Sequence, residues 1–186
     1  MPPAKGDAYM SDDRSTRSDR TARILTREFT SDLQDMETDD IRARRDEARA
    51  ERDYLSFLRR LIQSRQDMLS AEREARGRPG QFRAPLAEVL SGQGHTDSRG
   101  EAVHLQLPPE DMAAADARVS EILAEEAFAN PKELTDEQLD TMVATLHDEE
   151  QAVSSDRGAV IRALDKLQEE LKRRYREDPS QIPQEV

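Results

Sequence analysis

The sequence lacks cysteine and tryptophan and has few aromatic residues. The absence of cysteine excludes disulfides, thiolate metal sites and thiol catalysis. Aromatic residues make up 4% of the chain and charged residues 37%, a composition typical of long, solvated helices packed through narrow seams. No apolar run approaches the roughly 20 residues that span a bilayer, and the first twenty residues lack the apolar stretch of a signal peptide. We therefore expect a cytoplasmic protein without membrane contact.

Acidic residues outnumber basic ones, 40 against 28, but positive charge is locally concentrated. The formal net charge of −12 argues against general nucleic-acid binding, whose affinity comes from phosphate neutralisation, so we expect no direct DNA binding. Residues 42–65 nevertheless hold eight Arg against four acidic residues. An anionic ligand or partner at this segment, and a solvated helix with many salt bridges, are equally good explanations of that charge alone.

The residues that catalysis requires are not clustered. His95, His104 and His147 are scattered, and no nucleophile–base set or glycine-rich phosphate loop is present. We predict that the protein is not an enzyme and has no metal site.

Glycine and proline are nearly absent from two long segments, and this pattern predicts an all-α fold. Five of the seven glycines fall within residues 77–109, which indicates a connector. Helices are expected over 39–76, 110–129 and 135–177, the last with Thr135 as N-cap and Gln138 completing a capping box. Together, 36–178 form the expected domain, and 179–186 a short tail.

Residues 1–35 are predicted to be a mostly disordered tail with a short helix. The first twenty residues are polar, whereas 21–35 include Ile24, Leu25, Phe29 and Leu33. This second stretch fits a short amphipathic helix, a segment that folds on a partner, or a frayed tail, and the sequence does not separate the three.

The last helix has an apolar pattern with strict 4-3 spacing. Eight of its ten seam positions are aliphatic, and the other two are charged; the equivalent positions 98 residues earlier form a weaker seam in the first long helix. Such seams predict a long antiparallel coiled-coil hairpin of about 50 Å. The positions are Leu139, Val143, Leu146, Glu150, Val153, Arg157, Val160, Leu164, Leu167 and Leu171, matched by Ile41, Arg45, Ala48, Arg52, Leu55, Arg59, Ile62, Gln66 and Leu69.

A polar motif occurs once on each long helix, 98 residues apart. Both copies follow the spacing S-x2-R-x3-(Q/I)-x3-D, and Glu150 precedes the second serine by four residues. On an α-helix these steps keep the side chains within one stripe about 80° wide. Two helices with the same polar stripe indicate two halves of one ligand site. The copies are Ser56, Arg59, Gln63 and Asp67, and Ser154, Arg157, Ile161 and Asp165.

The side chains of this motif suit a ligand with guanine bases and phosphates. Aspartate can accept hydrogen bonds from the N1–H and N2–H groups of guanine, and arginine can bind phosphate, guanine or a stacked base. Two facing stripes fit a cyclic dinucleotide without singling it out. The alternative is a structural or adaptor coiled coil in which Arg59 and Arg157 only fix helix register. A register layer, however, needs no Ser or Asp at fixed offsets.

Over about residues 36–175 the chain resembles the RsiG anti-sigma factors, which carry a twin E-x3-S-x2-R-x3-Q-x3-D signature on an antiparallel coiled coil. The resemblance is clearest in residues 41–47 (IRARRDE) and 55–67 (LSFLRRLIQSRQD). It implies that the hairpin, loaded with cyclic di-GMP, captures a sigma factor of the WhiG type, a relative of flagellar sigma factors. Late sporulation genes then stay silent. It further implies that the ligand is a pair of nucleotides held between hairpin and sigma factor.

Carried over residue by residue, the resemblance assigns most of the site and leaves two departures. Arg52 occupies the first Glu position and Ile161 the second Gln position; Arg52 suits a phosphate contact but cannot accept from guanine. The implied cyclic di-GMP-binding residues are Ser56, Arg59, Gln63, Asp67, Glu150, Ser154, Arg157 and Asp165, with Arg52 and Arg60 as additional candidates.

The first long helix also has more apolar surface than one antiparallel neighbour requires. The extra residues either receive the short helix or remain exposed for a sigma-factor domain, and we expect a mixture of the two. They are Tyr54, Phe57, Leu58, Leu61 and Met68.

Overall fold

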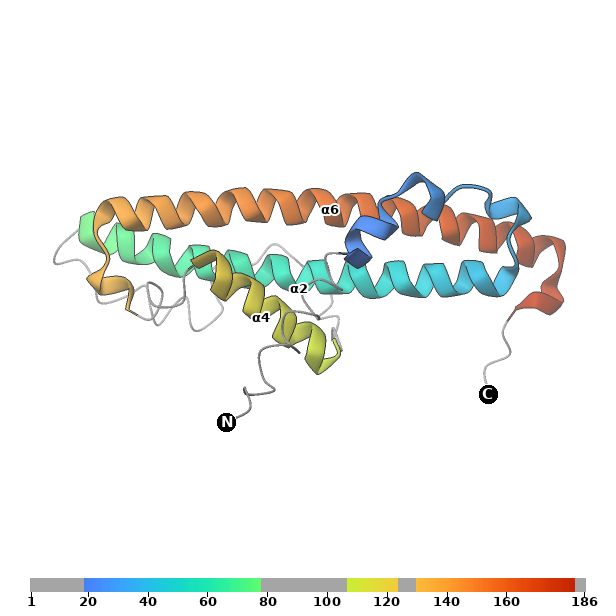
Figure 1. The fold of residues 1–186 in the computed structure, drawn as a ribbon, viewed down its shortest axis with the longest axis horizontal. Coiled ribbons are helices and arrows are strands. Elements are labelled where there is room, and N and C mark those ends of the chain that lie inside the picture. The colour runs from blue at the N-terminus through green and yellow to red at the C-terminus, as the bar shows by residue number, and fades with distance from the viewer. Residues whose placement is uncertain (1–18, 78–106, 124–129, 183–186) are drawn as a thin grey trace, which may run out of the picture.

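Two long helices dominate the fold. The computed structural model describes residues 19–77, 107–123 and 130–182, and these contain helices but no strand. Helices α2 (Thr38–Gly77) and α6 (Asp136–Glu177) lie side by side along the longest axis, and the shorter α4 (Pro109–Leu123) crosses α2 obliquely (Figure 1). The predicted all-α class is confirmed for the described part of the chain.

Short 3-10 helices flank the long ones. They are η1 (Arg27–Phe29), η2 (Leu33–Asp35), η3 (Pro131–Glu133) and η4 (Pro179–Gln181). Of the segments predicted from the sequence, residues 1–18, 78–106 of the connector, 124–129 of the short helix and 183–186 lie outside the described residues.

Local sequence explains where the helices begin. Thr135 caps α6, because its hydroxyl accepts from the backbone N–H of Gln138 at 3.2 Å while its own N–H donates to the Gln138 side chain at 2.7 Å. Helix α4 begins at Pro109, a position that needs no backbone donor. In α2 the acidic residues Asp39 and Asp40 stand in the first turn, where the helix dipole favours negative charge.

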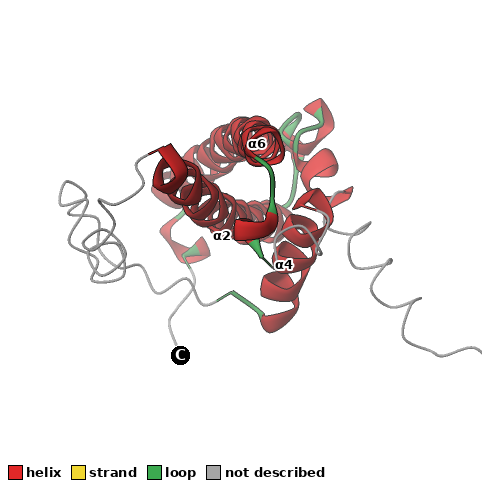
Figure 2. Cartoon of the chain, turned by 90° about the vertical axis from the view of Figure 1, so that its left-hand side faces the viewer, coloured by secondary structure: helices red, strands yellow, loops and turns green. Residues whose placement is uncertain are grey.

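Helices α2 and α6 run antiparallel. Near the start of α2, the hydroxyl of Thr38 accepts from Arg174 at 2.9 Å, and near its end Arg73 donates to Asp140 at 2.8 Å. Viewed end on, α2 and α6 form one layer, with α4 placed against α2 (Figure 2). This packing is compatible with the predicted coiled-coil hairpin.

The seam between α2 and α6 follows the predicted 4-3 spacing. The aliphatic seam positions of α6 are buried except Val143, which packs partly buried against the core. On α2 the apolar seam positions are buried and alternate with partly buried polar ones. The buried α2 positions are Ile41, Ala48, Leu55, Ile62 and Leu69, and the partly buried ones are Arg45, Arg52, Arg59 and Gln66.

Helix α4 packs mainly against α2. Its small residues Ala114 and Ala115 are buried, and small side chains permit close approach of two helices. On α2, Tyr54 and Leu58 are buried outside the seam, whereas Met68 is 49% exposed. The surplus apolar surface of α2 is therefore divided between packing and exposure, as expected.

Residues 19–35 correct one prediction, because they are packed rather than disordered. A helical turn at residues 19–24 leads into η1 and η2, and Ile24 and Phe29 are 1% and 5% exposed. Arg44 donates to the carbonyl oxygen of Phe29 at 2.8 Å, and Arg174 donates to that of Leu33 at 2.6 Å. The segment therefore gains its order from contacts with α2 and α6, which its own short apolar pattern does not reveal.

Two adjacent isomeric residues test this packing. We expect Ile24→Ala to lower the free energy of unfolding by about 2 kcal/mol or more, because a fully buried aliphatic side chain is lost. Leu25 is 39% exposed, so Leu25→Ala should change stability by less than about 0.5 kcal/mol. Urea denaturation followed by circular dichroism measures both. Equal effects of the two substitutions would show that the segment is not packed in this way.

Candidate functional site

The two motif copies meet across α2 and α6. From α2, Arg59 Nε donates to Glu150 Oε1 at 2.7 Å, and Gln63 Nε2 reaches the same oxygen at 3.2 Å. From α6, the Ser154 hydroxyl donates to it at 3.0 Å. We name these four residues the Glu150 corner. Three motif side chains thus converge on one carboxylate oxygen.

The electrostatics of this corner are internally balanced. The Glu150 side chain is 10% exposed and the Arg59 side chain 40% exposed. The hydrogen bond from Arg59 holds the pKa of Glu150 below its ordinary value, burial opposes this shift, and the Ser154 hydroxyl adds to it. Because the carboxylate stays ionised beside the guanidinium, the pair is close to neutral as a whole.

The second meeting point is built differently. Arg157 Nε donates to the Ser56 hydroxyl at 2.8 Å, and that hydroxyl donates to the backbone carbonyl of Arg52 at 2.6 Å. The Arg52 guanidinium turns along its own helix to Asp53, at 2.7 and 2.9 Å. We name Arg52, Ser56, Arg157 and Ile161 the Arg52 corner. No carboxylate from the opposite helix contacts Arg157 within the described residues.

The 98-residue repeat relates the two corners residue by residue. Arg59 and Gln63 correspond to Arg157 and Ile161, and Glu150 corresponds to Arg52. Since Gln63 and Glu150 contact each other, their two replacements belong to one corner. The antiparallel register concentrates both departures at the same place.

Glu51 does not restore the missing acid of the Arg52 corner. It neighbours Arg52 in sequence, but its side chain is fully buried and bound by Arg20 and Thr21 of the N-terminal segment. Its carboxylate therefore serves the packing of residues 19–35 rather than the motif.

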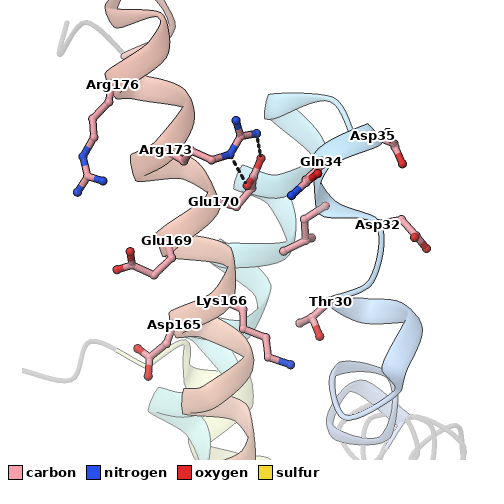
Figure 3. Close-up of a pocket in the computed structure, with 11 residues that line it drawn as sticks. Thr30, Asp32, Gln34, Asp35, Asp165, Lys166, Glu169, Glu170, Arg173 and Arg176 are labelled. Atoms are coloured by element: carbon pink, nitrogen blue, oxygen red, sulfur yellow. Dashed lines mark hydrogen bonds and ion pairs between the residues drawn. The ribbon is translucent and has the colours of Figure 1, made fainter.

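The remaining predicted site residues are exposed and lie apart from the network. Asp67 is on α2 and Asp165 on α6, toward opposite ends of the site, and Arg60 points to solvent. Asp165 lines an open pocket of about 820 Å³ between residues 30–35 and α6, where Glu170 is bound by Arg173 (Figure 3). None of the other predicted site residues lines this pocket. The structure brings six of the eight motif residues together and leaves the two aspartates outside.

Sequence reasoning missed one contact next to the site. Arg118 of α4 forms an ion pair with Glu149, the residue before Glu150. The sequence carried no signal for it, because the two residues belong to different helices and neither stands in a repeated pattern. It ties α4 to α6 beside the Glu150 corner.

Two other kinds of feature are absent from the described ranges. None of the helices there is long and apolar enough to cross a bilayer. His, Asp and Glu side chains in those ranges form no group of three suited to a metal ion.

Comparison with known proteins gives one match. The model of the RsiG-like family matches residues 27–90, about a third of the chain, which includes the first motif copy. The resemblance to RsiG is confirmed over this range. The match links this part of the chain to the RsiG-like family. No curated protein and no solved structure matches the chain.

The lowered pKa of Glu150 predicts a pH-dependent stability. Above its ordinary pKa of 4.5 the carboxylate is ionised in folded and unfolded chains, so the ion pair contributes fully; as the pH falls through the lower folded-state pKa, the contribution is lost. Glu150→Gln should therefore lower the free energy of unfolding by about 1 kcal/mol at pH 7. The difference from the parent should shrink at pH 3.

Urea denaturation at the two pH values measures this difference. Asp148→Asn is the control, because Asp148 is exposed on the same helix. A gap between parent and Glu150→Gln that stays constant or widens at pH 3 would contradict the assigned ion pair.

Proposed function

Because residues 27–90 match the RsiG-like family, we propose that this protein is a cyclic di-GMP-dependent anti-sigma factor. In this proposal α2 and α6 are the two arms of a coiled-coil hairpin. Loaded with the nucleotide, which binds as a pair, the hairpin sequesters a WhiG-type sigma factor in the cytoplasm and blocks transcription of late sporulation genes. The observation that carries the proposal is the convergence of both motif copies on one stretch of the helix pair.

The geometry of the motif supports a ligand rather than packing alone. Arg157 is half-buried at the seam, yet its contact within the described residues is a serine hydroxyl and not a carboxylate. A partly desolvated arginine without an acidic partner is costly in free energy. An anionic ligand would offset that cost, because guanidinium groups bind phosphate through paired hydrogen bonds.

The exposed aspartates supply the second part of the chemistry. Asp67 and Asp165 follow their arginines by eight residues and are open to solvent. A carboxylate in that position can accept from the Watson–Crick edge of guanine with both oxygens. Arg157 therefore provides a cation for phosphate, and the exposed Asp67 and Asp165 provide acceptors for the bases.

A single substitution at the second copy tests the proposal. We expect Arg157→Ala to weaken cyclic di-GMP binding by about tenfold to a hundredfold, since a charge-assisted contact is lost. Arg157 is preferred to Arg59 for this test, because Arg59→Ala would leave Glu150 buried without its partner. Calorimetric titration, with and without a flagellar-type sigma factor, measures the affinity, and cyclic di-AMP is the ligand control.

Arg162→Ala is the matched protein control, because Arg162 is an exposed arginine on the same helix, outside the stripe. Circular dichroism should show unchanged helix content in both variants. Wild-type affinity in Arg157→Ala, or no binding of cyclic di-GMP by the parent in either condition, would reject the proposal.

The second candidate is a structural or adaptor coiled coil with a polar register layer. The observation in its favour is the Arg59–Glu150 ion pair, which satisfies itself across the helices without a ligand. On this alternative Arg157→Leu should raise the melting temperature, because an aliphatic layer replaces a poorly partnered charge, and should leave partner binding intact. Thermal denaturation with a sigma-factor pull-down separates the candidates: loss of nucleotide-dependent capture eliminates the register-only function.

A further inference from the structure

We propose that Arg52 and Arg157, together with Ser56, form a phosphate-binding corner, so that the two ends of the twin-motif site bind different parts of an anionic ligand. The inference deepens the proposed function and rests on it for the natural ligand, a cyclic dinucleotide. The phosphate-binding chemistry itself follows from the residues of this corner.

The two corners differ in charge. At the Glu150 corner one guanidinium meets one buried carboxylate, so the charges cancel. At the Arg52 corner there are two guanidinium groups: that of Arg52 forms an ion pair with Asp53, and that of Arg157 donates to the Ser56 hydroxyl. The Arg52 corner thus keeps an excess positive charge inside a protein whose formal net charge is −12. Such local positive potential favours an anion.

The repeat explains why this charge is available. At the Glu150 corner, the repeat positions are occupied by an anion, Glu150, and a cation, Arg59. At the Arg52 corner, the equivalent positions are occupied by two cations, Arg52 and Arg157. Like charges repel, and each arginine turns to a different neighbour: Arg52 to Asp53 and Arg157 to the Ser56 hydroxyl. A phosphate between the two guanidinium groups would replace repulsion with charge-assisted hydrogen bonds.

The local competitor for Arg52 is weak. Asp53 is its immediate neighbour on the same helix, and both side chains are about a third exposed, at 30% and 33%. Ion pairs of that exposure contribute little to stability, so a phosphate can displace this one. Ile161, which replaces the glutamine of the other corner, adds a partly buried apolar side chain and no competing acceptor.

The Glu150 corner suits a different part of the ligand. All three hydrogen bonds to Glu150 reach Oε1, which leaves Oε2 to accept from an N–H donor. A phosphate approaching Arg59 would meet that buried carboxylate and be repelled. The phosphate therefore goes to the Arg52 corner, and N–H donors go to the Glu150 corner.

The first experiment detects the anion directly on the full-length protein. Inorganic pyrophosphate is titrated while the arginine Nε–Hε signals are followed by NMR, with each signal assigned by an Arg→Lys variant. The signals of Arg52 and Arg157 should shift together, and those of Arg59 and Arg45 should stay. Equal shifts of Arg59 and Arg157, or no shift at Arg52, would overturn the inference.

The second experiment uses the proposed ligand and a closely matched control. Arg45 lies one heptad before Arg52, binds its own neighbour Asp46 in the same way, and is 29% exposed. We expect Arg52→Gln to weaken cyclic di-GMP binding by about tenfold, as for loss of one charge-assisted contact, and Arg45→Gln to retain parental affinity. Equal affinities of the two variants would overturn the role of Arg52.

The outcomes separate the two proposals. If the parent binds cyclic di-GMP but Arg52→Gln binds equally well, the phosphate-binding corner is wrong and the proposed function stands. If the parent fails to bind cyclic di-GMP with or without sigma factor, the proposed function fails. The pyrophosphate titration then still decides whether the corner binds phosphate, because it does not depend on the dinucleotide.

Discussion

The hydrogen bond from Arg59 to the buried carboxylate of Glu150 joins two residues that are 91 positions apart in the sequence. A carboxylate buried in a helix seam costs free energy unless a cation reaches it. Here the cation comes from the opposite helix, and both groups are satisfied in the register in which Arg59 faces Glu150. The same register brings the two motif copies together. The position of the candidate site therefore depends on this ion pair.

The internal repeat makes the pairing approximately symmetric, and one position breaks the symmetry. Replacing an acid by Arg52 removes a negative charge and adds a positive one, which changes the corner by two charges. Packing tolerates the change because Arg52 is partly exposed and reaches Asp53. The cost appears at Arg157, which has no acidic partner on α2 within the described residues and donates to the Ser56 hydroxyl instead. Stability and ligand recognition are thus linked through the same two arginines.

Much of the fold could be predicted because its information is local and periodic. The 4-3 spacing of apolar residues predicts the buried face of α6, and the capping box formed by Thr135 and Gln138 predicts where the helix begins. The packing of residues 19–35 could not be predicted, because Ile24 and Phe29 are buried only by helices that follow later in the chain. For the site, the sequence predicts the residues but not their partners. In an antiparallel helix pair, the residue numbers of two facing positions have a nearly constant sum. The register in which Arg59 faces Glu150 therefore also makes Arg52 face Arg157.

The asymmetry of the site also constrains how a regulator of this kind can work. Under the proposed function, capture of an anion is concentrated at the Arg52 corner, because Arg59 is already paired with Glu150. The exposed Asp67 and Asp165 lie beyond the network, so base recognition requires contacts farther along the helices. Under the proposed function, a ligand held mainly at one corner would leave much of its surface open. A sigma factor that covers this surface would add contacts to ligand and helices at once, and binding of nucleotide and partner would then reinforce each other.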